Sequence, residues 1–162
     1  MVYVGCVLII VLSSVVGSGL VKLFIIRDKF YKELKLFVGY AKTEIEFSQI
    51  KLTELFDKFF EEKQVEFLKE FQEIKNYLIQ NEKKCLDNKI LYFLKREERR
   101  NIEVFFRGFG TKGVSEEIGQ LEKYQEELKR KINEVESIRT TNEGLIYKLS
   151  LAVGVVVCIL IA

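Results

Sequence analysis

The segment Gly108-Phe109-Gly110-Thr111-Lys112-Gly113 has the spacing G-x-G-x-x-G, which brings a dinucleotide's pyrophosphate close to the backbone in some folds. That chemistry requires a preceding strand, a following helix and further parallel strands. Residues 102–106 could form one strand, but the chain offers no second one, and no Gly-Lys-Ser/Thr sequence completes a P-loop. We therefore interpret these glycines as a sharp turn between two helices, where a side chain would block the backbone conformation or a close contact.

The densest group of charges is Lys95-Arg96-Glu97-Glu98-Arg99-Arg100. At helical spacing Lys95 can pair with Glu98, and Glu97 can pair with Arg100. This pattern is typical of a solvated helix face. An acidic partner surface or anionic lipid headgroups are the alternative reading of the same residues.

Nothing in the sequence points to catalysis, and we expect no enzyme, no cofactor and no metal site. The chain has no His, which removes the commonest general base and a common metal ligand. Its 24 acidic residues fall almost entirely at solvent-facing positions of amphipathic helices. The three cysteines, Cys6, Cys85 and Cys158, are odd in number and widely spaced, so they predict neither a disulfide framework nor a zinc site.

The charged residues are confined to the middle of the chain. All 26 basic and 24 acidic residues lie between Lys22 and Lys148, and both ends are apolar. Residues 1–21 would reach about 30 Å as a helix, enough to cross a bilayer core. No basic residue precedes them, so an anchor is favoured over a cleaved signal peptide. We expect an N-terminal transmembrane anchor at 1–24, a cytoplasmic helical bundle at 25–143, and a shorter C-terminal transmembrane segment at 144–162.

The basic residues that flank both apolar ends all lie on the side of the charged middle. By the positive-inside rule this keeps the middle in the cytoplasm and places both termini outside. Within the middle, apolar residues recur at steps of three and four, which is the period of amphipathic helices. We expect a first helix continuous with the apolar start, three shorter pieces, and a last long helix that begins at Ser115 and runs toward the apolar end. The sequence thus predicts an all-α fold.

Three features, in this order along the chain, carry a resemblance to the stage III sporulation protein AB family. The first is the helix end at 43–47 followed by 51–56, with Glu-Ile and an aromatic residue before a Leu. The second is the turn at 105–115, with Gln120 at the matching place after it. The third is a long helix that runs into an apolar tail containing Gly154. The family is itself similar to the cytoplasmic F-domain of type II secretion and type IV pilus platform proteins.

The resemblance implies a non-enzymatic platform subunit of the channel complex between mother cell and forespore in endospore formation. The protein would sit in the mother-cell membrane around the forespore. Its implied partners are membrane lipid, the other subunits of the complex and the complex's cytoplasmic secretion-type ATPase, with homo-oligomers possible and no nucleic acid. The interaction surface expected on this basis is the glycine turn with the start of the next helix. Its residues are Phe109, Gly110, Gly113, Ser115, Glu116 and Gln120.

A generic membrane-tethered coiled-coil scaffold, acting in cell division or envelope organisation, fits the three-four spacing nearly as well. Such a scaffold would extend as a long dimeric rod, whereas a unit like the F-domain would be compact. The sequence leaves both readings open.

Overall fold

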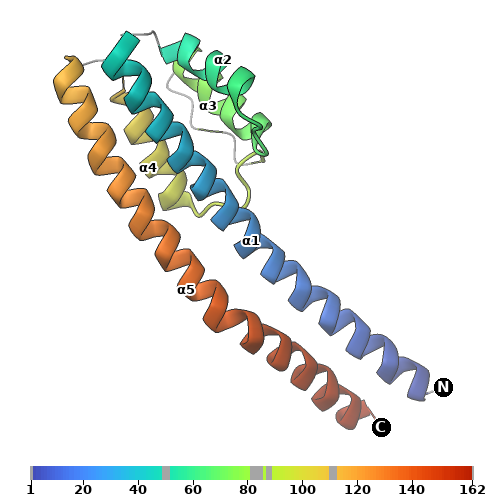
Figure 1. Cartoon of the computed structure of the whole chain (residues 1–162). Helices are drawn as coiled ribbons and strands as arrows, with labels where there is room; N and C mark the ends of the chain where they lie inside the picture. Colours follow the sequence, from blue (N-terminus) through green and yellow to red (C-terminus); the bar gives the residue numbers. More distant parts are fainter. Residues whose placement is uncertain (1, 49–51, 81–85, 87–88, 110–112, 162) are drawn as a thin grey trace. The chain divides into compact units, whose positions relative to one another are not determined.

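The computed structural model describes residues 2–48, 52–80, 86, 89–109 and 113–161 (Figure 1). Five helices account for nearly all of them: α1 (Val2–Ser48), α2 (Leu52–Glu62), α3 (Leu68–Gln80), α4 (Arg96–Arg107) and α5 (Val114–Ile161). No strand occurs within these residues. The predicted all-α fold is therefore confirmed.

The two long helices extend through the apolar ends without a break. α1 continues from the apolar start to Ser48, and α5 continues from Val114 to Ile161, as the sequence predicted. The start of α5 differs by one residue from the expectation. The N–H of Glu117 donates to the carbonyl of Gly113 at 2.9 Å, so Gly113 is the N-cap and Ser115 lies inside the first turn.

The core between residues 29 and 132 is built around aromatic side chains. Phe37 on α1 contacts Phe56 on α2, Phe71 on α3 and Phe106 on α4, with ring centroids 4.4, 5.6 and 6.0 Å away. All four rings are buried. Because one residue touches three other helices, α2, α3 and α4 are gathered on one face of α1. Aromatic pairs at these separations add to the free energy gained by removing the rings from water.

The middle helices are shorter than their apolar spacing suggested. α3 begins at Leu68, so Val65, which fits the same apolar spacing, lies before the helix. Residues 89–95 form turns before α4 begins at Arg96. Phe93 nevertheless packs into the core, 5.2 Å from Phe30 between ring centroids. Apolar spacing alone did not distinguish a buried turn from a helix here.

The chain divides into two units, one of Lys29–Ile132 and one of Met1–Asp28 with Asn133–Ala162. The predicted boundaries at 1–24, 25–143 and 144–162 stay predictions. In the second unit, Gly17 on α1 and Gly154 on α5 are both buried. The guanidinium of Arg139 lies 3.6 Å from the carboxylate of Asp28, which is itself buried. This ion pair joins α1 to α5 within that unit.

The hydropathy of the described helices bears on the predicted transmembrane segments. None of its helices contains a stretch both long enough and apolar enough to cross a membrane. The transmembrane segments expected at 1–24 and 144–162 are not supported by this finding.

Candidate functional site: a groove between α4 and α5

The predicted interaction residues differ in their exposure to solvent. Phe109 is buried, with its ring 5.7 Å from Phe105 and 6.3 Å from Phe106 between centroids. Ser115 and Glu116 are exposed in the first turn of α5, whereas Gln120, further along, is half-buried. Gly113 is the N-cap described above, and Gly110 lies outside the described residues. Phe109 therefore supports the turn from inside, and of the five predicted residues that the structure describes, only Gln120 lines the groove described below.

The two described glycines at the ends of the motif do not need to be glycine for steric reasons. A Cβ on Gly113 would meet nothing within 4 Å, and one on Gly108 would have its nearest neighbours at 3.7 Å, an ordinary contact distance. Gly108 has φ −84°, in the right-handed helical region. The expectation that a side chain would be blocked is wrong at these two positions. Gly108 acts as the C-cap of α4, where its N–H donates to the carbonyls of Val104 and Phe105.

An open groove of about 540 Å³ runs between α4 and α5 beside this turn. Its walls come from α4 and α5, with Tyr31 contributed by α1. It is lined by Tyr31, Glu98, Asn101, Ile102, Val104, Phe105, Gly108, Gln120, Lys123, Tyr124, Glu127, Leu128 and Lys131. The volume falls in the range of ligand-binding clefts.

The middle of the groove has an aromatic floor. The rings of Phe105 on α4 and Tyr124 on α5 are stacked, with centroids 3.5 Å apart and planes 9° apart. Ile102 and Leu128, both buried, lie beside them among the lining residues. Burial raises the pKa of the Tyr124 phenol above its ordinary value, with smaller contributions from Tyr31 and Glu127. The phenol is therefore neutral at physiological pH, and the floor carries no charge.

An ion pair lies at one end of the groove. A carboxylate oxygen of Glu98 lies 3.4 Å from the ammonium of Lys131, and Glu98 is only 6% exposed. The same carboxylate accepts the backbone N–H of Lys95 at 3.0 Å, which caps the start of α4. The prediction that Glu98 belongs to a solvated face is therefore wrong. The helical spacing predicted a side-chain pair between Lys95 and Glu98. In the structure the Glu98 carboxylate instead accepts the backbone N–H of Lys95.

The exposed side of α4 is more basic than the composition of the whole helix suggests, because two of its three acidic residues are engaged inside the protein. Glu98 is engaged internally, and Glu103 accepts the backbone N–H of Leu86 at 2.7 Å. Arg96, Arg100 and Arg107 remain exposed on the outer side of the helix, against the single exposed acid Glu97. Arg107 also donates to the hydroxyl of Tyr77 at 2.7 Å.

The lining side chains suit binding. Neutral aromatic rings at the floor and charged or amide groups at the rim are the usual composition of a protein-binding cleft. Among the residues for which the structure gives side chains, no group of three or more His, Cys, Asp or Glu residues is placed to hold a metal ion.

Sequence reasoning missed most of the groove. Phe105 and Tyr124 each follow the apolar spacing of their own helix, and nothing local in the sequence shows that the two rings meet. Lys131 lies 33 positions beyond Glu98, so no helical rule relates them. The usable signal was the Glu at the third residue of α4, the position typical of a capping box.

A family model described as stage III sporulation protein AB matches residues 3–162, almost the entire chain. No curated protein and no solved structure matches the chain.

Proposed function

Because the chain belongs to the stage III sporulation protein AB family and has a role in sporulation, we propose that it is a membrane-held platform subunit of the mother cell–forespore channel complex. The family match along almost the whole chain is the observation that carries the proposal. In this role the protein binds other components and turns over no substrate.

The arrangement of the middle unit supports a binding role. A set of buried aromatic rings holds α2, α3 and α4 on one face of α1. An open groove lies between α4 and α5. A firm core with an open cleft is what a docking platform requires. On this proposal the partners are the other subunits of the complex and its cytoplasmic secretion-type ATPase.

The exposed apolar side chains of both ends support attachment to lipid. Leu12 and Val16 on α1, and Leu149 and Val156 on α5, are each more than half exposed. In water such side chains are unfavourable, whereas against acyl chains they are not. The hydroxyl of Ser18 donates to the carbonyl of Val15 at 2.8 Å, so this polar group is satisfied within its own helix. We propose that the middle faces the mother-cell cytoplasm and both termini lie outside.

Deletion and complementation test the sporulation role. Deleting the coding sequence should lower the number of heat-resistant spores, and the full chain should restore it. Normal spore numbers in the deletion strain would contradict the proposal. Carbonate washing of membranes tests the attachment separately, because a lipid-embedded chain stays with the pellet and a peripheral one is released.

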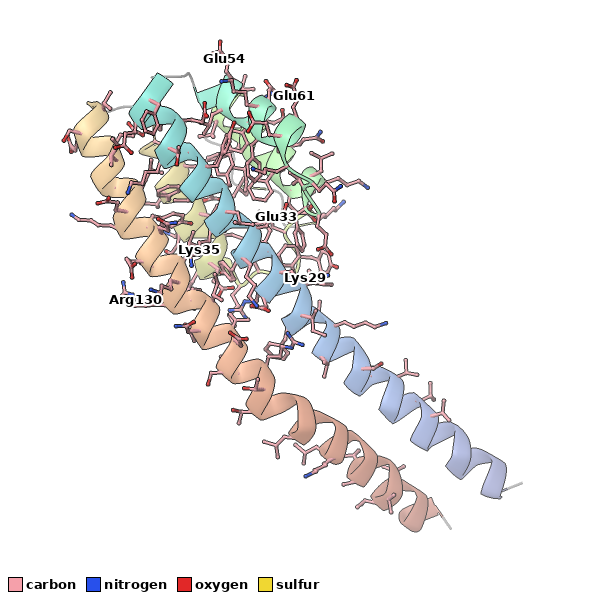
Figure 2. All side chains as sticks on the ribbon, in the orientation of Figure 1. Lys29, Glu33, Lys35, Glu54, Glu61 and Arg130 are labelled. Carbon is pink, nitrogen blue, oxygen red and sulfur yellow. The ribbon has the colours of Figure 1, made fainter. Side chains whose placement is uncertain are left out.

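A membrane-tethered coiled-coil scaffold remains the second candidate, favoured by the unbroken length of α5. Single cysteines introduced along the exposed side of α5, for example Arg130→Cys, distinguish the two. Arg130 projects away from the other helices (Figure 2). A parallel dimeric rod predicts disulfide-linked dimers at helical intervals along α5, whereas a platform predicts none in a regular series.

A further inference from the structure

The unit of Lys29–Ile132 has one end at which both long helices pass into the other unit. α1 enters this unit at Lys29, and α5 leaves it after Ile132. A series of contacts joins these two points. The ring of Phe30 lies 5.2 Å from the ring of Phe93, and Glu98, shortly after Phe93, lies 3.4 Å from the ammonium of Lys131. The turns at 89–95 and the start of α4 therefore lie at this end.

The connection between α2 and α3 lies at the same end of the unit. The ammonium of Lys29 is 2.8 Å from the carboxylate of Glu66, and the ring of Phe67 is 5.5 Å from the ring of Phe30 between centroids. Four segments thus come together here, and we call them the collar. The collar consists of residues 29–33, 63–67, 89–99 and 129–132.

The collar is strongly basic. It contains ten basic and four acidic residues, whereas the rest of the same unit contains twelve basic and sixteen acidic residues. The stretches that lead from the collar to the uncharged ends, residues 22–28 and 133–148, hold four of each sign and do not offset this excess. Figure 2 shows Glu54 of α2 at the opposite end of the unit from Lys29. The unit is therefore polar in charge, with its positive end where α1 and α5 leave it.

Most of the acids of the collar are engaged by groups of the protein. Glu33 accepts two backbone N–H groups, Glu66 pairs with Lys29, and the buried Glu98 pairs with Lys131. The exposed acids are Glu66 and Glu97. The exposed bases of the collar are Lys29, Lys32, Lys63, Lys89, Lys95, Arg96, Lys129 and Arg130. Such a surface attracts anionic groups.

An exposed aromatic side chain lies among these bases. Tyr92 is 60% exposed, although Leu91 and Phe93 on either side of it are buried. Its ring packs edge-on against Phe93, with centroids 5.5 Å apart. Tyrosine is enriched where a protein meets the headgroups of a bilayer, because its ring is apolar and its hydroxyl is polar.

The position of the nearest exposed apolar side chain favours lipid over an acidic protein. Leu23 is exposed and lies six residues before Lys29 in α1, which is about 9 Å along the helix. The headgroup layer of a bilayer is about 5–8 Å deep, and electrostatic attraction extends about 8 Å beyond it at physiological ionic strength. A bilayer that covers Leu23 therefore brings its headgroups within reach of the collar.

We propose that the collar binds anionic headgroups of the same membrane that holds the apolar ends, with Arg96 and Arg130 against lipid phosphates and Tyr92 at headgroup level. The inference rests on the proposed membrane attachment and deepens it by naming the lipid class and the residues in contact. Binding at the collar turns the positive end of the unit toward the bilayer and the end with Glu54 toward the cytoplasm. An acidic protein surface is the competing occupant.

Quenching by labelled headgroups tests the contact. The full chain, with alanine in place of Cys6, Cys85 and Cys158, carries a bimane fluorophore on Gln64→Cys, an exposed and uncharged residue of the collar. It is reconstituted into vesicles of phosphatidylcholine, alone or with about 30% phosphatidylglycerol, that contain a trace of lipid with a spin-labelled headgroup. We expect phosphatidylglycerol to increase the quenching severalfold.

The matched control places the same fluorophore on Ser115→Cys, exposed in the first turn of α5. That turn lies toward the other end of the unit, where Glu122 of α5 pairs with Lys42 of α1. Quenching there should not depend on phosphatidylglycerol. Sodium chloride at about 0.5 M should remove the increase at Gln64, because it screens the attraction.

Charge reversal tests the residues. Arg130→Glu and Arg96→Glu should each lower the equilibrium constant for headgroup contact, taken from the quenched and unquenched fluorescence lifetimes, by about fivefold or more, whereas Arg130→Lys should retain it. Lys123→Glu makes the same charge change at an exposed residue of α5 two turns before Arg130, outside the collar, and should leave the constant unchanged. Circular dichroism checks that each variant is folded.

The outcomes separate the collar from the attachment. Equal quenching at Gln64 in both kinds of vesicle, as an acidic protein partner would give, or an equal increase at Ser115, would overturn the collar proposal. Flotation of the full chain with phosphatidylcholine vesicles after a carbonate wash reports on attachment alone. A chain that floats without quenching that depends on phosphatidylglycerol keeps the attachment and loses the collar. A chain that does not float contradicts the attachment and the collar together.

Discussion

The carboxylate of Glu33, in the middle of α1, accepts the backbone N–H of Phe67 at 3.3 Å, just where α3 begins. It also accepts the N–H of Glu66 at 3.2 Å. The carbonyl of Phe67 receives the first bond of α3, from the N–H of Phe71. One side chain of α1 therefore satisfies two backbone donors directly before the first residue of α3.

Replacing Glu33 should show the value of this contact. Glu33→Ala leaves both N–H groups without their acceptor and should lower the free energy of unfolding by about 1–2 kcal/mol. Glu33→Gln keeps an oxygen acceptor and should cost clearly less. Urea unfolding of the full chain in mild detergent, followed by far-ultraviolet circular dichroism, measures both. Equal losses for Ala and Gln would show that the charge, and not the hydrogen bonds, is what matters.

The pH dependence of stability should carry the signature of the same carboxylate. Desolvation raises the pKa of Glu33 above its ordinary value of 4.5 and outweighs the lowering by the two N–H groups, while the charges of Glu66 and Glu70 raise it further. The folded protein then binds this proton more tightly than the unfolded chain does. Its contribution to stability is full below pH 4.5 and is lost as the pH rises through the raised pKa. Glu33→Gln should remove that fall, which a comparison of unfolding curves across this window detects.

Phe37 should be among the least replaceable residues of the core. Its ring is buried and contacts rings of α2, α3 and α4, so truncation leaves a cavity that several helices would have to close. Phe37→Ala should lower the free energy of unfolding by about 3–5 kcal/mol. Phe47, on the same helix, is 80% exposed, and Phe47→Ala should change it by less than about 0.5 kcal/mol. Similar losses at both positions would contradict the described core.

Local spacing predicted the buried face of α1 well. Phe30, Leu34 and Phe37 recur at helical steps, and all three are buried. The unbroken courses of α1 and α5 also followed from the sequence, because neither contains proline and both keep an apolar stripe.

Contacts between distant residues could not be predicted in this way. Glu33 and Phe67 are 34 positions apart, and no periodicity relates a carboxylate on one helix to the N-terminus of another. The groove is of the same kind, since it exists only because α4 packs against α5. The start of α5 was also slightly misplaced, because the sequence predicted Ser115, whose side chain is suited to a helix start, whereas the helix begins at Val114 with Gly113 as its N-cap.

The ion pair at the end of the groove should show energetic coupling. Lys131→Ala leaves the buried Glu98 carboxylate without its cation and should lower the free energy of unfolding by about 1–3 kcal/mol. Glu98→Gln keeps an acceptor for the N–H of Lys95 but removes the charge. In the double variant the losses should not add, with a coupling of about 0.5 kcal/mol or more. Strict additivity would mean that the two side chains do not interact in solution.

Two glycines inside long helices should be replaceable by alanine with a gain in stability. A Cβ on Gly119 of α5 would meet nothing within 4 Å, so Gly119→Ala should raise the free energy of unfolding by about 0.5–1 kcal/mol through the lower backbone entropy of the unfolded chain. On Gly39 of α1 the added Cβ would lie 3.2 Å from the amide nitrogen of Gln125, the end of a flexible side chain. That side chain must move by a few tenths of an ångström, so the gain from Gly39→Ala should be smaller. A loss of stability from Gly119→Ala would contradict the open space found at that position. A larger gain from Gly39→Ala than from Gly119→Ala would contradict the contact between α1 and α5 within the unit of Lys29–Ile132.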